Sequence, residues 1–161
     1  MTIWRGRQRM AGVAGRMGVV AAALGLAAVV AAAAWVFAGR DRPSRATLAQ
    51  GQELYAMHCA SCHGADLEGQ PDWKLPLPSG RLPAPPHDAS GHSWHHPDSL
   101  LHRIVKDGTA AVVGGGYETD MPGFGDQLDD AQIDAILSYI KSTWPRRERD
   151  HQRALSRAEN R

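Results

Sequence analysis

The stretch Cys59-Ala60-Ser61-Cys62-His63-Gly64 decides the fold of this chain, because it holds both cysteines of the 161 residues and a histidine directly after the second. Two cysteines separated by two residues and followed by histidine form the attachment pattern of a c-type haem. Each thiol can add to one vinyl group of the haem, and the adjacent histidine can bind the iron. The stretch therefore predicts one covalently bound haem at Cys59 and Cys62, with His63 as an iron ligand.

A Cys-x-x-Cys pair also occurs in zinc sites and in thiol redox centres. Zinc would need two further ligands, usually a second cysteine pair or closely spaced histidines, and the sequence has no third cysteine. A thioredoxin-like centre would follow a strand in a βαβ unit, whereas the residues around Cys59 have a helical, glycine-rich pattern. Haem attachment explains the cysteines better than either alternative, and it leaves no cysteine for a disulfide bond.

A sixth iron ligand is expected from Met121. Three of the five methionines lie within the first 17 residues, and Met57 precedes the cysteines on the same helical turn. Met121 begins the stretch Met121-Pro122-Gly123-Phe124-Gly125, which predicts a loop without helical constraint. Such a loop can lie against a flat porphyrin and direct a thioether at the metal. The alternative is that Met121 only fills the core.

Together, the Cys59–Gly64 motif and the Met121 loop about sixty residues later resemble class I monohaem cytochromes c. The resemblance covers about residues 46 to 144 and is specific at these two motifs. It implies an all-α fold, with three main helices and long loops around one covalently bound haem c. It also implies that His63 and Met121 are the axial iron ligands, and that the protein transfers single electrons and is not itself an enzyme.

Two segments have the caps and apolar spacing of amphipathic helices. Thr47 with Gln50 three residues later is a capping-box pattern, and the helix it predicts runs into the haem cysteines. Asp129 with Gln132 predicts a second helix, whose apolar stripe ends before Pro145. These segments lie where the resemblance implies the first and last helices of the domain.

The resemblance implies two further contacts. The terminal helices should cross closely, with Gly51 of the first against Tyr139 of the last, because a residue without a side chain permits a close approach. A proline carbonyl should accept a hydrogen bond from the ligand histidine and fix its orientation. Pro83, Pro85 and Pro86 are equal candidates for that proline.

A third helix is predicted over about residues 98 to 106, and the segment before it is different in kind. Residues 71–97 contain seven prolines, which oppose both helix and sheet, so we expect an irregular loop around the haem. This loop also carries four histidines that could bind copper or zinc, or replace Met121 as an iron ligand. They are His87, His92, His95 and His96.

The first 46 residues predict targeting to a membrane. Residues 1–16 carry four arginines and no acidic residue, and residues 17–38 carry no charge over 22 residues, enough to cross a bilayer as a helix. We expect 17–38 to be a transmembrane anchor or an uncleaved signal, with 1–16 in the cytoplasm and the rest exported. A linker at 39–46, the cytochrome domain at 47–145 and a polar, basic tail at 146–161 would follow. The expected location is the bacterial inner membrane, with the haem domain in the periplasm.

Charge divides the exported part into two regions. Residues 46–144 carry five basic and thirteen acidic side chains, a net charge of −8, whereas residues 146–161 carry six arginines and three acids, a net charge of +3. The acidic domain gives no reason to expect nucleic acid as a partner. It would instead attract a redox protein with a basic docking face, such as a haem-copper oxidase or a quinol-oxidising complex. No small-molecule substrate is expected.

Two other functions remain open from the sequence. A small peroxidase or a haem-based sensor would need a vacant sixth iron position. A copper-handling protein would use the histidine-rich loop, with the haem as its redox helper.

Overall fold

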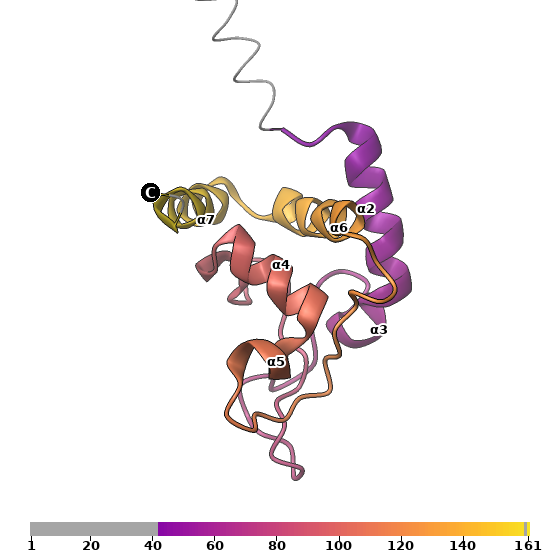
Figure 1. Cartoon of the computed structure of the whole chain (residues 1–161), viewed down its shortest axis with the longest axis vertical. Coiled ribbons are helices and arrows are strands. Elements are labelled where there is room, and N and C mark those ends of the chain that lie inside the picture. The colour runs from indigo at the N-terminus through magenta and orange to yellow at the C-terminus, as the bar shows by residue number, and fades with distance from the viewer. Residues whose placement is uncertain (1–41, 160) are drawn as a thin grey trace, which may run out of the picture. The chain divides into compact units, whose positions relative to one another are not determined.

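The computed structural model describes residues 42–159 and residue 161, and these form helices joined by loops (Figure 1). No strand occurs in this part of the chain, as the predicted all-α fold requires. The helical segments are α2 (Arg45–His58), α3 (Ala60–His63), the short 3₁₀ helix η1 (Ser93–His95), α4 (Asp98–Asp107), α5 (Thr109–Val113), α6 (Asp130–Thr143) and α7 (Arg146–Glu159).

The predicted transmembrane segment 17–38 and the basic segment 1–16 lie outside the described residues. Within residues 42–159, none of the helices has both the length and the apolar character that a membrane crossing requires.

Helix α2 begins earlier than the sequence predicts. Its N-cap is Ser44, whose side-chain oxygen accepts a hydrogen bond from the backbone N–H of Thr47 at 3.0 Å. Thr47 therefore lies in the first turn and is not the cap, which corrects the predicted start. Serine is at least as good a cap as threonine, so the earlier residue takes the role and the last residues of the expected linker join the helix.

Helix α6 begins as predicted, at a capping box formed by Asp129 and Gln132. It packs across α2 at Gly51, where an added Cβ atom would lie 2.0 Å from the backbone oxygen of Ala135 and 3.0 Å from the Cβ of Tyr139. The predicted approach of Gly51 to Tyr139 is thus confirmed, with the backbone of α6 even nearer. Only glycine permits this distance between the two helices.

The buried core lies between α2, α4 and α6. Tyr55 of α2 and Ile133 and Ile136 of α6 are almost completely buried. Trp144 closes the core at the end of α6, and its indole N–H donates to the backbone oxygen of His87 at 2.7 Å. The proline-rich loop is in this way held to the end of α6.

Helix α4 matches its prediction closely, and a short helix follows it that the sequence did not predict. Gly108 ends α4 with a φ of +85°, a backbone conformation that favours glycine, and α5 begins at the next residue. The predicted irregular loop at 71–97 is observed, apart from helix η1 at Ser93–His95.

The polar tail is also helical. Pro145 ends α6 as predicted, because the residue before a proline favours extended backbone and Trp144 has a ψ of 146°. The carbonyl of Pro145 then accepts the first hydrogen bond of α7, from the N–H of Arg149. Helix α7 packs beside η1 and α4 (Figure 1).

Candidate functional site

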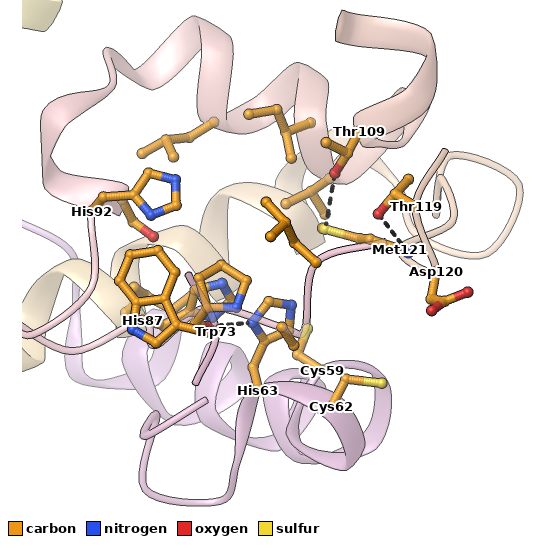
Figure 2. Close-up of a pocket in the computed structure, with 18 of the residues that line it drawn as sticks. Cys59, Cys62, His63, Trp73, His87, His92, Thr109, Thr119, Asp120 and Met121 are labelled. Carbon is orange, nitrogen blue, oxygen red and sulfur yellow. Dashed lines mark hydrogen bonds between the residues drawn. The ribbon is translucent and has the colours of Figure 1, made fainter. Parts of the chain in front are cut away.

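A cavity of about 390 Å³ opens between α2, α3, the proline-rich loop, α4 and α6, and its volume lies in the range of ligand sites. Cys59, Cys62, His63 and Met121, the four predicted site residues, all line it. Figure 2 shows His63 with the two cysteines on one side of the cavity and Met121 with Thr109 on the other. The fold therefore brings together two motifs that lie far apart in the sequence.

The imidazole of His63 is buried and oriented. Its Nδ1 lies 2.8 Å from the backbone oxygen of Pro85. A carbonyl can only accept, so Nδ1 donates its proton, and the other nitrogen, Nε2, keeps a free lone pair. Burial lowers the pKa of His63, and the Pro85 bond only partly opposes this, so the neutral form that can bind a metal is favoured. Of the three candidate prolines, Pro85 makes the contact.

The two cysteines are free thiols in the wall of the cavity. Cys59 is half-buried at the junction of α2 and α3, whereas Cys62 is exposed. Burial, assisted by the neighbouring Cys62, raises the pKa of Cys59 to about 11. Both side chains are accessible from the cavity, and neither is used in a disulfide bond.

Two threonines hold Met121, one at its thioether and one at its backbone N–H. The hydroxyl of Thr109, at the start of α5, lies 3.4 Å from the Met121 sulfur, and the Thr119 hydroxyl accepts from the Met121 N–H at 3.2 Å. Immediately after it, Gly123 lies so close to the end of α4 that a Cβ atom would be 2.7 Å from the backbone carbon of Asp107. The loop is therefore fixed against α4, and Met121 is fixed with it.

Arg81 joins two loops: the proline-rich loop of residues 71–97 and the methionine loop, which contains residues 121–125. Its guanidinium forms ion pairs with Asp120 at 2.5 Å and with Glu118 at 3.6 Å. Asp120 directly precedes Met121, so this contact holds the methionine loop to the proline-rich loop. No local pattern predicts this pairing, because the partners lie 39 residues apart in segments without regular structure.

His87 forms part of the cavity wall and stacks on His63, with ring centroids 3.9 Å apart and planes inclined by 15°. Its buried Nδ1 has no hydrogen-bond partner among the described residues. Burial and the neighbouring His63 hold the pKa of His87 well below its usual value. A buried polar atom beside a cavity and without a partner is expected where a bound molecule supplies that partner.

The histidine-rich loop does not form a metal site in the described part of the chain. Within it, no three His, Cys, Asp or Glu side chains are grouped so that they could hold an ion. His92 stacks on Trp73, and His95 stacks on Trp94. Both histidines are thus packed against tryptophan rings of the same loop.

The sequence model of the Cytochrome c family matches residues 48–144, more than half of the chain. This chain belongs to the cytochrome c family. Its two motifs identify it as a class I c-type cytochrome, and proteins of this family hold haem c covalently. The cavity fits that group, because it offers two free thiols, a buried imidazole with one unengaged nitrogen, a thioether and walls of mostly apolar side chains.

Several curated proteins are similar to this cytochrome. The dihydro-heme d1 dehydrogenase of Pseudomonas aeruginosa is 34% identical over 98 residues, which are 61% of this chain and 16% of that protein. The gluconate 2-dehydrogenase cytochrome c subunit of Pantoea cypripedii is 30% identical over 95 residues, or 58% of this chain and 20% of that subunit. The cytochrome bc1 complex cytochrome c subunit of Mycobacterium tuberculosis is 32% identical over 118 residues, or 73% of this chain and 35% of that subunit.

The cytochrome thus spans only about a sixth to a third of the length of these relatives, and no solved structure matches it significantly. The likeness to cytochrome subunits of redox complexes assigns it to haem-based electron transfer. Sequence reasoning missed Thr109 and Arg81 as parts of the site, because their contacts with Met121 and Asp120 join separate segments of the chain. It named His87 only as a possible metal or iron ligand, and the stacking of His87 on His63 depends on the path of an irregular loop.

Proposed function

We propose that this cytochrome carries single electrons between redox proteins, with His63 and Met121 as the axial ligands of its haem iron. The observation that supports the proposal is that an imidazole with its Nε2 free and a thioether enter one cavity from opposite sides (Figure 2). Haem c supplies the Fe(III)/Fe(II) couple when it is bound.

The protein contributes orientation and exclusion of water. The Pro85 carbonyl fixes the ring of His63 and increases the electron density on Nε2. The Thr109 hydroxyl withdraws density from the Met121 sulfur, and a thioether that donates less favours the reduced state. The buried apolar side chains of α4 and α6 keep the surroundings at low dielectric, which also favours the state of lower charge.

The partners are proposed to be redox proteins with basic docking faces. The net charge of −8 over residues 46–144 supports this, because opposite charges accelerate encounter. Relatives named as subunits of a cytochrome bc1 complex and a gluconate dehydrogenase support a place beside a quinol-oxidising complex or a dehydrogenase. A haem-copper oxidase is an acceptor of the same kind.

A tethered, exported location is part of the proposal. The uncharged run of 22 residues at 17–38, preceded by four arginines, supports it. The full chain, produced in a bacterium that matures c-type haem, should remain with membranes in high salt. Release into the soluble periplasm, with a mature N-terminus near Gly39, would mean that the segment is a cleaved signal.

The test of the ligand assignment is Met121→Ala. The variant should keep its covalent haem, lose the weak near-infrared band of methionine-bound ferric haem, bind carbon monoxide readily and have a lower reduction potential. A parent protein that already binds carbon monoxide and lacks the band would instead have an open sixth position, as a peroxidase or a sensor requires. Retention of the parent spectrum and potential in the variant would exclude Met121 as the ligand.

A further inference from the structure

Helix α7 lies outside the region that matches the cytochrome c family, which ends at residue 144. The family therefore does not explain why the chain continues through 14 more helical residues. Electron transfer at the cavity does not use them either, since no residue of α7 lines it.

The inner face of α7 holds the helix in a fixed orientation on the domain. Gln152 is 1% exposed, and its amide donates to Asp98 Oδ1 at 2.7 Å and to the backbone oxygen of His96 at 3.3 Å. The backbone N–H of Asp98 donates to the Ser156 hydroxyl at 3.0 Å. The hydroxyl of the next residue, Ser99, donates to the carboxylate of Glu159, which lies about one turn further along α7. These contacts determine which side chains of α7 face outward.

The outward face is basic. Its exposed charged side chains on the solvent side of the helix are Arg146, Arg147, Asp150, Arg153 and Arg157, with a net charge of +3. Asp150 pairs with Arg146 and Arg153, whereas Arg147 and Arg157 make no ion pair within the described chain. Arg146, Arg153 and Arg157 recur at helical spacing and form one row, about 16 Å long at 1.5 Å per residue.

This face has no large apolar side chain. The exposed large hydrophobic residues of the described chain all lie elsewhere, at Met57, Leu75, Leu77, Leu82, Val113 and Tyr117. A stable protein interface needs an apolar core. A row of arginines without one is instead suited to a surface of closely spaced phosphates, because guanidinium groups bind phosphate through two parallel hydrogen bonds.

We propose that the outward face of α7 binds the surface of a membrane that contains anionic phospholipid. Residues 46–144 have a net charge of −8 and are repelled by the same surface, so the charge distribution selects one orientation. In that orientation α7 lies on the lipid. The methionine loop and α5, at the far end of the domain from α7 in Figure 1, face away from it. This inference does not depend on the identity of the iron ligands.

The test measures how accessible α7 is in the full haem-loaded chain mixed with vesicles. Ala154→Cys places a thiol on the exposed face of α7, and Ser79→Cys places one on the proline-rich loop as a control. Each is treated with a polyethylene glycol maleimide, and the rate of modification is read on a gel. Vesicles of phosphatidylglycerol and phosphatidylcholine are compared with vesicles of phosphatidylcholine alone.

We expect modification at residue 154 to slow several-fold on the anionic vesicles only, and modification at residue 79 to stay unchanged. The population bound through α7 should fall about five-fold for each arginine removed, so Arg147→Gln with Arg157→Gln should restore the rate. The matched control, Lys74→Gln with Arg103→Gln, removes two exposed charges from other elements and should leave the protection intact. Salt at 1 M, where the screening length is about 3 Å, should abolish it.

Three outcomes would overturn the proposal. Equal rates with and without anionic lipid would show that α7 does not meet the surface. Protection on phosphatidylcholine alone would assign the contact to the apolar N-terminal segment. Protection by an added acidic protein, with none on vesicles, would assign the basic face to a protein partner.

Discussion

Thr109 and Met121 meet side chain to side chain, with the hydroxyl 3.4 Å from the sulfur. Through this contact the five-residue helix α5 touches the thioether that we propose as an iron ligand. Sulfur is a weak acceptor, so the bond matters mainly through the electron density that it withdraws.

We expect Thr109→Val to lower the reduction potential by tens of millivolts. Valine keeps the shape of threonine but cannot donate a hydrogen bond, so the sulfur becomes a stronger donor and favours ferric iron. A net hydrogen bond of about 1 kcal/mol corresponds to about 40 mV for one electron. Spectroscopic redox titration measures the change, and Thr109→Ser, which keeps the hydroxyl, serves as the control. Identical potentials in the parent and the valine variant would show that the contact does not tune the iron.

At the scale of elements, the crossing of α2 and α6 depends on Gly51. Its position leaves no room for a Cβ atom, because the backbone of Ala135 is already in contact. The two helices contribute much of the core. If they moved apart, Ile136 and Ile140, which are buried and line the cavity, would be displaced and the cavity wall would change.

We expect Gly51→Val to destabilise the domain by about 1 to 3 kcal/mol through overpacking. Denaturant unfolding should show a lower midpoint, and warming should remove methionine ligation earlier than in the parent. Ala49→Val introduces the same side chain on the exposed part of α2 and is the control. Unchanged stability of the Gly51 variant would contradict the close crossing.

Asp98 joins three helices. It lies in the first turn of α4, accepts from Lys141 of α6 at 2.7 Å and accepts from Gln152 of α7 at the same distance. Burial opposes its ionisation, but the hydrogen bonds from Lys141, Gln152 and Ser156 together outweigh this and lower the pKa of Asp98. The folded state therefore holds the proton less tightly than the unfolded state does.

This linkage sets the sign of a pH effect. The stabilisation by Asp98 should be complete above its unfolded pKa of about 3.9 and be lost as the pH falls through the lower folded value. Asp98→Asn should cost roughly 1 kcal/mol at pH 7 in denaturant unfolding, and its difference from the parent should shrink towards pH 3. Asp126→Asn, at an exposed site without an ion pair in the described chain, is the control. A difference that stays constant with pH would contradict the assignment.

The same elements show what the sequence can predict. The cap at Asp129 and the end of α6 before Pro145 depend on local residue types, and both are observed. The contact at Gly51 is instead what the resemblance to class I cytochromes c implies, and it is observed as well. Ser44 and Thr47 are both good caps three residues apart, so local pattern cannot choose between them. The choice of Pro85 depends on the path of an irregular loop, which no periodicity encodes.

Helix α7 was missed for a different reason. It has only one buried residue, the polar Gln152, so it lacks the apolar stripe by which a surface helix is recognised. Its stability comes from hydrogen bonds to Asp98 and Ser99, which lie more than 50 residues away in the sequence.

At the scale of the whole domain, the cavity lies inside the core rather than beside it. Six residues belong both to the buried core and to the cavity wall: Leu101, Val105, Ile136, Leu137, Ile140 and Trp144. Without a bound group, these side chains face an empty volume and lose contacts that a close-packed interior requires.

We expect Cys59→Ser with Cys62→Ser, which cannot hold haem covalently, to lose cooperative unfolding and to be cleaved rapidly by trypsin. Met121→Ala, which keeps the thioether bonds, should resist cleavage much more and is the control. Time courses of digestion measure the difference. A protease-resistant double variant without haem would show that the remaining core is sufficient.

Because the cavity lies within the core, the haem also affects how long the protein persists in the cell. Haem attachment and completion of the fold become one event, so a chain that does not receive haem also does not fold completely. Such copies remain substrates for degradation, and loaded copies do not. The steady-state amount of this cytochrome should therefore follow the haem supply, with few inactive copies competing for the same docking sites.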